Sequence, residues 1–303
     1  MAMRELSSPP SLTSLYPKAL AGSTVQPVLG HLPGLGGRFK RGRELPDEEL
    51  VLTDAGIERE HLREYDRVCG FTLRDELPAT YPHLLAFPLS MELMTSTSFP
   101  FPVIGLVHIA NRIEQLRPIR DDERLTVRVR TEDLADHERG TQFEIAADGE
   151  VAGETVWRSR STYLHRSGGG DDGKKRRAES PKLPEPAAIW EIPGDIGRRY
   201  AAVSGDRNPI HLHPLTAKLF GMPRPIAHGM WLKARCLAAL EGHLPDAYAV
   251  EMRFKLPVYL PSKVSFRSWS EGSAHRFALH DANGEKPHLE GETTALGDSA
   301  VAE

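Results

Sequence analysis

The sequence predicts an α+β protein in which one unit, a helix followed by an antiparallel meander, occurs twice. Three observations predict it: a weak internal repeat, strands of alternating polarity in both halves, and a glycine- and proline-rich segment between the halves. The chain has 303 residues, which is enough for two domains at roughly 150 residues each. Hydrophobic residues make up 40% and charged residues 26%, as is typical of a folded protein.

The internal repeat is a weak echo of residues 200–239 in residues 65–94. The first positions to align are offset by 135 residues: Tyr65 with Tyr200, Cys69 with Ser204, and Gly70 with Gly205. The offset grows by four residues farther along, as one loop insertion would produce. The alternative is that two unrelated α+β domains share a few residues by chance.

Both matches are followed by segments in which outward and inward residues alternate, the pattern of antiparallel strands. The predicted strands are 124–130, 141–147 and 156–163 in the first half and 263–270, 275–280 and 289–296 in the second. Asp148-Gly149 and Asn283-Gly284 lie between the second and third strands of each set, and such dipeptides favour tight hairpin turns. The same order of elements is therefore expected in both halves.

These patterns divide the chain into four parts. We expect an N-terminal extension over 1–46, a first unit over 47–165, a flexible linker over 166–187 and a second unit over 188–303. The linker is made of glycine, proline and charged residues. Its basic run, 174–177, is typical of a solvated tether rather than of a phosphate site.

Composition and motifs exclude several classes of function. The net charge of −4 argues against nucleic-acid binding, and no run approaches the ~18 apolar residues of a membrane span. Two cysteines, Cys69 and Cys236, are too few for a disulfide framework, which favours a reduced, cytoplasmic setting. The N-terminal residues have no apolar stretch, so we expect no secretory signal. No nucleotide-binding motif is found and the two cysteines show no metal-ligand spacing, so we expect no cofactor and no metal.

The first candidate site is the segment 204–213, SGDRNPIHLH. Pro209 keeps Asn208 out of helical geometry, and Gly205-Asp206 favours a turn, so Asp206 and His211 can converge as an acid/base pair. The alternative is that Asp206 and Asn208 only form side-chain-to-backbone turns and that His211 is incidental.

The second candidate site is Ala227-His228-Gly229, which precedes an apolar segment expected to form a buried helix. Gly229 would start that helix, where free backbone N–H groups can bind a developing negative charge. The alternative is that Gly229 relieves helix packing and that His228 is an ordinary core residue.

These motifs, S-G-D-x-N-P-I-H followed by I-A-H-G-M, closely resemble the MaoC-like hydratase/dehydratase family, including its (R)-specific enoyl-CoA hydratases. The chain is most similar to the actinobacterial 3-hydroxyacyl-thioester dehydratases. The resemblance implies a double hotdog, in which each hotdog is a long helix wrapped by an antiparallel sheet. It is strong over about 189–303, weaker over the first half, and does not cover 1–46.

The resemblance also implies a hydro-lyase that interconverts trans-2-enoyl and (3R)-3-hydroxyacyl thioesters of coenzyme A or acyl carrier protein in fatty-acid metabolism. Asp206 and His211 would act on water and Gly229 would hold the thioester carbonyl. Supporting or substrate-binding positions would be Ser204, Gly205, Asn208 and His228.

The first half departs from the motif. Phe71 and Glu76 stand where Asp206 and His211 stand in the second half, so we expect the first hotdog to be non-catalytic. Its looser segment 78–88 is a candidate acyl tunnel. The possible lining residues are Met91, Met94, Phe99 and Phe101, with ordinary core packing as the alternative.

Two further readings of function stay open, namely a hotdog acyl-CoA thioesterase and a non-catalytic acyl-thioester-binding subunit. The fused pair would form a pseudo-dimer within one chain, and a further homodimer is possible.

Overall fold

The computed structural model describes residues 1–29, 44–166 and 183–297, with only the backbone described over 21–29. Its strands are β1 (Ala2–Leu6), β2 (Glu48–Ala55), β3 (Val107–Gln115), β4 (Leu125–His137), β5 (Gly140–Val151), β6 (Glu154–Arg166), β7 (Ala188–Ile192), β8 (Tyr248–Phe254), β9 (Ser262–Glu271), β10 (Ala274–Asp281) and β11 (Pro287–Ala295). Its helices are α1 (Leu12–Leu29), α2 (Arg59–Cys69), α3 (Pro82–Met94), α4 (Ile196–Ser204), α5 (Pro209–Leu212), α6 (Pro214–Leu219), α7 (Gly229–Leu240) and the 3-10 turn η1 (Glu241–His243).

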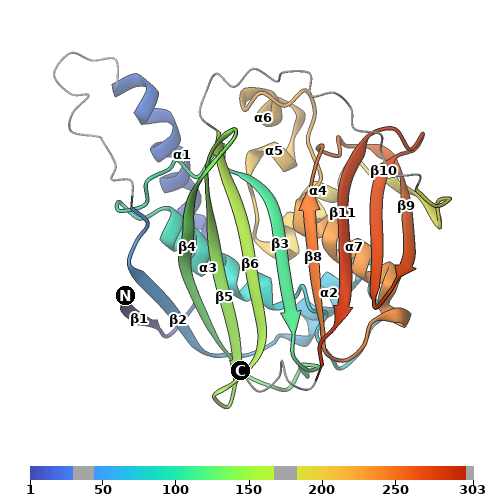
Figure 1. The fold of residues 1–303 in the computed structure, drawn as a ribbon. Helices are drawn as coiled ribbons and strands as arrows, with labels where there is room; N and C mark the ends of the chain where they lie inside the picture. The colour runs from blue at the N-terminus through green and yellow to red at the C-terminus, as the bar shows by residue number, and fades with distance from the viewer. Residues whose placement is uncertain (30–43, 167–182, 298–303) are drawn as a thin grey trace.

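The described strands form a single 11-stranded sheet in the order β1-β2-β4-β5-β6-β3-β8-β11-β10-β9-β7 (Figure 1). Neighbouring strands are antiparallel except for β1, which adds to the edge in parallel with β2. Alternation along β4 shows why these segments form strands, since Leu125, Val127 and Val129 are fully buried while the residues between them are half-buried.

The sheet contains the predicted duplication. The order β2-β4-β5-β6-β3 in the first half recurs as β7-β9-β10-β11-β8 in the second, and β3 pairs with β8 at the centre. The helices α2 and α4 end alike, at the left-handed Gly70 and Gly205, whose N–H groups bond the carbonyls of Asp66 and Ala201. Gly70 and Gly205 are 135 positions apart, and so are Asp66 and Ala201, which confirms the offset found in the sequence. The fold is a double hotdog.

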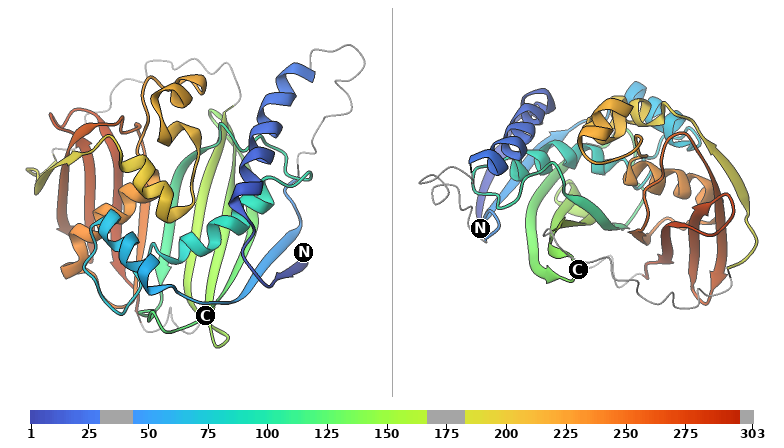
Figure 2. Two further views of the ribbon diagram at one scale, coloured as in Figure 1. Left: turned by 180° about the vertical axis from the view of Figure 1, so that it is seen from behind. Right: turned by 90° about the horizontal axis from the view of Figure 1, so that it is seen from above.

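The helices of both hotdogs cover one face of the sheet, as the view from behind shows (Figure 2). Helix α3 packs on β2, β4 and β5, while α2 packs against α4 across the two halves. Lys233 on α7 is fully buried and donates to the carbonyls of Asn111 on β3 and Val250 on β8, at 3.1 and 3.2 Å. This lysine therefore joins the second central helix to strands of both hotdogs.

One expectation about the turns of the first half was wrong. Strand β5 runs through Asp148-Gly149, because Asp148 forms ion pairs with Arg130 and Arg160 on the neighbouring strands. The hairpin turn falls instead at Ala152-Gly153, both with positive φ. The Asn283-Gly284 turn lies between β10 and β11 as expected, with Gly284 at φ 77°.

The segment 78–88 is also more regular than expected. Helix α3 begins at Pro82, which occupies a first-turn position where its missing N–H costs nothing, and it continues through Pro88. Met91, Met94 and Phe99 are buried in the common core, with Phe101 packed against it. Their placement agrees with the core-packing alternative.

Most of the predicted linker, including the basic run 174–177, lies outside the described residues. Among the described helices, none combines the length and the apolar composition that a membrane crossing requires.

Candidate active site

Asp206 follows directly after α4. The helix ends at Gly205, which adopts φ 73°, a left-handed conformation that glycine enters without strain. The backbone N–H of Asp206 then donates to Ser204 Oγ at 3.1 Å. Ser204 and Gly205 therefore turn the chain so that the Asp206 carboxylate leaves the helix end.

The next residues form the short helix α5, which begins at Pro209. Asn208 is extended, with φ −56° and ψ 125°, as the following proline predicts. Its N–H donates to Asp206 Oδ1 at 3.1 Å, and its own Oδ1 accepts from the N–H of Ile210 at 3.4 Å. The local turns that the sequence left as an alternative are thus present, and they place Asp206 and His211 on one loop.

His211 has a defined tautomer. Its Nδ1 lies 2.7 Å from the carbonyl oxygen of Ile226, which can only accept, so Nδ1 carries the proton and Nε2 carries the lone pair. The loop is held tightly against α4, because a Cβ added to Gly197 would lie only 2.0 Å from the carbonyl oxygen of His211. A glycine at 197 is therefore needed for α5 to sit where it does.

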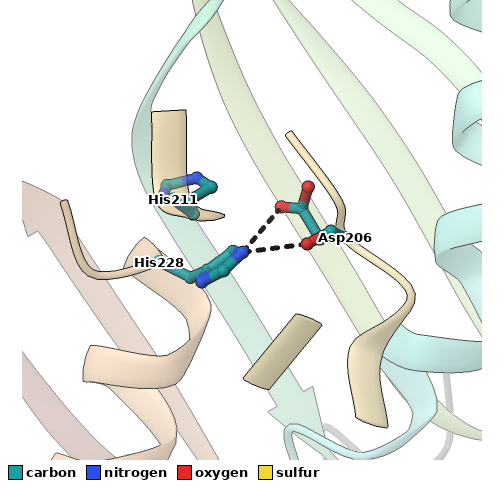
Figure 3. Close-up of side chains that lie close together, drawn as sticks. All are labelled: Asp206, His211 and His228. Atoms are coloured by element: carbon teal, nitrogen blue, oxygen red, sulfur yellow. Dashed lines mark hydrogen bonds and ion pairs between the residues drawn. The ribbon is translucent and has the colours of Figure 1, made fainter. Parts of the chain in front are cut away.

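His228 lies between the two candidate catalytic residues (Figure 3). It is the N-cap of α7, and its Nε2 donates to the backbone carbonyl of Asp206 at 3.0 Å and lies 3.9 Å from Asp206 Oδ2. Its ring stacks on that of His211, with centroids 3.6 Å apart. His228 is thus a structural partner of both residues rather than an isolated core histidine.

Gly229 is the first residue of α7, as the sequence predicted. The N–H groups of a first helical turn have no carbonyl of their own helix to bond, and they favour negative charge. A Cβ at this position would lie 3.0 to 3.3 Å from the ring of Phe254 on β8. A side chain here would press on Phe254, so close packing of helix on sheet, the alternative reading, and a helix N-terminus beside the catalytic loop are both present at this glycine.

Burial sets the ionisation of the two imidazoles. It lowers the pKa of His211, and it lowers the pKa of His228 to about 3, so both are neutral at pH 7. Burial opposes ionisation of Asp206, but His228, His211 and the hydrogen bonds from the Asn208 N–H and the Tyr16 hydroxyl outweigh it and hold its pKa below the usual range. The two hydrogen bonds favour the carboxylate whatever the charge of the imidazoles.

Among the described residues, Asp206, His211 and His228 are close enough together to hold a metal ion, since one possible ligand atom of each lies within 4.8 Å of the others. His228 Nε2 carries a proton in this arrangement because it donates to a carbonyl. That nitrogen is therefore not a metal ligand, whereas the lone pair of His228 Nδ1 has no hydrogen-bond partner among the described residues. The hydrogen bonds that the trio makes are those expected of acid/base groups.

The structure thus brings the predicted residues of both motifs into one site. Sequence reasoning missed Gly197 and, above all, Tyr16, whose hydroxyl lies 3.0 Å from Asp206 Oδ1. Tyr16 belongs to α1, in the N-terminal extension that the motif resemblance does not cover, and no local pattern indicates its role.

Comparisons with known proteins agree with the motifs. The family model of the MaoC like domain matches residues 177–292. The 3-hydroxyacyl-thioester dehydratase X of Mycobacterium tuberculosis is 40% identical over 224 residues, which are 73% of this chain and 80% of that protein. An (R)-specific enoyl-CoA hydratase of Aeromonas caviae is 37% identical over 70 residues, 22% of this chain and 52% of that protein.

Solved structures show the same likeness. The crystal structure of HtdX from Mycobacterium tuberculosis superimposes with a TM-score of 0.74 and 35% identity, covering 82% of this chain and all of that one. The match spans both hotdogs rather than the motif alone. On these grounds the chain belongs to the MaoC-like hydratase/dehydratase family.

Proposed function

We propose that this protein is a hydro-lyase that reversibly adds water to trans-2-enoyl thioesters of coenzyme A or acyl carrier protein, forming (3R)-3-hydroxyacyl thioesters. One observation carries the proposal: an ionised Asp206 and a neutral His211 meet beside the N-terminus of α7. The printed names of the similar proteins, a 3-hydroxyacyl-thioester dehydratase and an (R)-specific enoyl-CoA hydratase, support the same chemistry.

In the hydration direction, the water oxygen attacks the β-carbon of the enoyl thioester. Asp206 Oδ2 and His211 Nε2 are the two lone-pair sites suited to accept a proton from this water. A proton is returned to the α-carbon, so that one water is added across the double bond. Dehydration is the reverse. Positioned acid/base groups contribute about 10²–10⁴-fold to such a reaction.

Charge that develops on the thioester oxygen during the attack needs a second stabilising group. We assign this role to the backbone N–H of Gly229 at the start of α7, where hydrogen-bond donation and the helix dipole act together. Ser204, Gly205, Asn208 and His228 hold the loop through the bonds described above.

The first hotdog would then be non-catalytic. Phe71 and Glu76 replace the acid/base pair, and the position aligned with Gly229 is Ser90, which lies inside α3 rather than at a helix start. The Ser90 hydroxyl donates to the carbonyl of Ala86, so this turn offers no free helix end. We accordingly assign catalysis to 188–303 and a supporting role to 47–165.

The setting that we propose is cytoplasmic. Cys69 and Cys236 are free and buried, which suits a reducing compartment. The two hotdogs already associate through β3 and β8 within one chain, and a homodimer of whole chains stays a prediction.

The test follows loss of enoyl-thioester ultraviolet absorbance with short- and long-chain trans-2-enoyl-CoA, alongside an assay for free thiol. We expect rapid loss without thiol release in the wild type, and a fall of about 10²–10⁴-fold in Asp206→Asn and His211→Ala. Glu76→Gln, at the exposed aligned position in the first hotdog, is the matched control and should retain full activity.

Release of thiol at the rate of absorbance loss would identify a thioesterase instead. Equal inertness of the wild type and both variants, on coenzyme A and carrier-protein thioesters alike, would contradict the enzyme proposal and favour an acyl-binding role.

A further inference from the structure

Helix α1 brings a tyrosine from the N-terminal extension to the catalytic loop. The Tyr16 hydroxyl lies 3.0 Å from Asp206 Oδ1 and 3.2 Å from the carbonyl oxygen of Gly205, and it accepts a hydrogen bond from the N–H of Arg207. One phenol thus contacts three consecutive residues of the loop, from a position 190 residues away in sequence.

The phenol has one proton to donate, which limits what these contacts can be. The hydroxyl oxygen accepts from Arg207 N–H, and its one proton goes to the nearer and charged acceptor, Asp206 Oδ1 at 3.0 Å, with the Gly205 carbonyl at 3.2 Å as a weaker second acceptor. Oδ1 therefore receives two donors, Tyr16 and the Asn208 N–H. Oδ2, which faces His228 at 3.9 Å, keeps its lone pairs for the reaction.

The phenol itself is not an acid or base in this setting. Burial and the adjacent Asp206 carboxylate raise the pKa of Tyr16 far above its usual value, so that it stays a neutral donor at any working pH. It acts on the reaction through Asp206.

The first two turns of α1 are fixed by packing on both sides of this tyrosine. Leu15 is 1% exposed and Ala19 is 2% exposed, both within the common core. Leu12 reaches Gly205, where an added Cβ would lie 2.4 Å from Leu12 Cδ1. Strand β1 pairs in parallel with β2 over five residues and sets where the helix starts.

We propose that Tyr16 is a positioning residue for Asp206: its hydroxyl holds Oδ1 and the Gly205–Arg207 backbone, so that Oδ2 is the oxygen left to accept a proton from the reacting water. The N-terminal extension is thereby a part of the active site and not an appendage to it. The catalytic consequence rests on the hydration reaction proposed above, whereas the effect on the carboxylate does not.

The experiment replaces Tyr16 by phenylalanine, which removes the hydroxyl and keeps the ring. We expect an unchanged melting temperature and a kcat lowered about 10–100-fold, the effect of losing a hydrogen bond to a charged group, with KM within about twofold. Tyr248→Phe is the matched control, since Tyr248 is a buried tyrosine at the opposite end of β8 from Phe254, and it should change neither constant.

A second readout does not depend on turnover. The titration of the Asp206 carboxyl, followed by NMR of protein labelled at the aspartate carboxyl carbon and assigned with Asp206→Asn, should move to higher pH in Tyr16→Phe. Other titratable groups around Asp206 are unchanged by the substitution, namely His211, His228, Tyr200, Tyr163, His83 and His108.

The outcomes separate the two proposals. Wild-type protein without hydration activity would end the proposed reaction, yet the carboxyl titration would still decide the role of Tyr16. An Asp206 titration that Tyr16→Phe leaves in place, or a kcat within twofold of the wild type, would overturn the inference. Should Tyr16→Phe fold poorly, Leu12→Ala retains the phenol and loosens its helix, and it should shift both readouts in the same direction by less.

Discussion

The close contact between α4 and α5 gives a sharp test of how the catalytic histidine is placed. In Gly197→Ala, the new Cβ would lie 2.0 Å from the carbonyl oxygen of His211, whereas real Cβ contacts essentially never fall below 3.0 Å. The atom met is backbone, so α5 must move by about 1 Å, and a displacement of this size costs about 100-fold in rate.

Stability should change far less than activity. Overpacking costs about 1–3 kcal/mol, but alanine in place of glycine inside a helix recovers about 1 kcal/mol. We therefore expect kcat to fall about 100-fold while the melting temperature drops by only a few degrees. Steady-state kinetics and thermal unfolding measure the two effects.

Gly242→Ala is the control for this substitution, because a Cβ at Gly242 in η1 meets nothing within 4 Å. It should leave both quantities unchanged. Full activity and unchanged stability in Gly197→Ala would refute the reasoning that Gly197 fixes the position of His211.

Three further predictions concern ionisation and packing. The reaction needs neutral His211 and ionised Asp206, and the pKa of each lies below its usual value. The pH profile of kcat/KM should therefore be level from pH 7 to 8 and fall on acidification with a midpoint below 6.5. A midpoint of 7 or above would contradict this. Burial, and after it the charge of Glu241, raises the pKa of Asp66 to about 7, so the folded state loses stability as pH rises from about 4 to 7. In urea unfolding, the free energy of unfolding of Asp66→Asn should exceed that of the wild type by about 1–2 kcal/mol at pH 8 and by less at pH 5. An equal difference at both pH values would be inconsistent with this. In Gly229→Ala the new Cβ would lie 3.0 Å from the half-buried Phe254 ring, which can shift by a few tenths of an ångström, so thermal unfolding should change by no more than a few degrees while kcat/KM falls; a loss of stability without a loss of activity would contradict a role in holding the thioester carbonyl.

Much of the fold could be predicted because its signals are local. Period-two alternation marks the strands, as in β4, and the two helix ends at Gly70 and Gly205 mark the repeat. The hairpin at Asp148-Gly149 was misplaced because ion pairs across strands, which the local sequence does not show, keep Asp148 inside β5. Tertiary contacts outweighed turn propensity there.

The site divides in the same way. Asp206 and His211 lie within one loop, so their convergence could be inferred from spacing and from Pro209. Gly197 could not be recognised, since its constraint is a single close approach to a backbone carbonyl 14 residues later. Tyr16 was beyond reach because its contact with Asp206 joins segments 190 residues apart, and a tyrosine in an uncovered extension has no distinguishing pattern.

The central claim is that Asp206 in the second hotdog directs water to one face of an enoyl thioester. The most direct test is the configuration of the product formed from a short trans-2-enoyl-CoA, determined by chiral chromatography for the wild type and for Asp206→Asn. The account predicts the (3R) alcohol from the wild type and almost no product from the variant. A (3S) product, or equal yields from the two proteins, would contradict it.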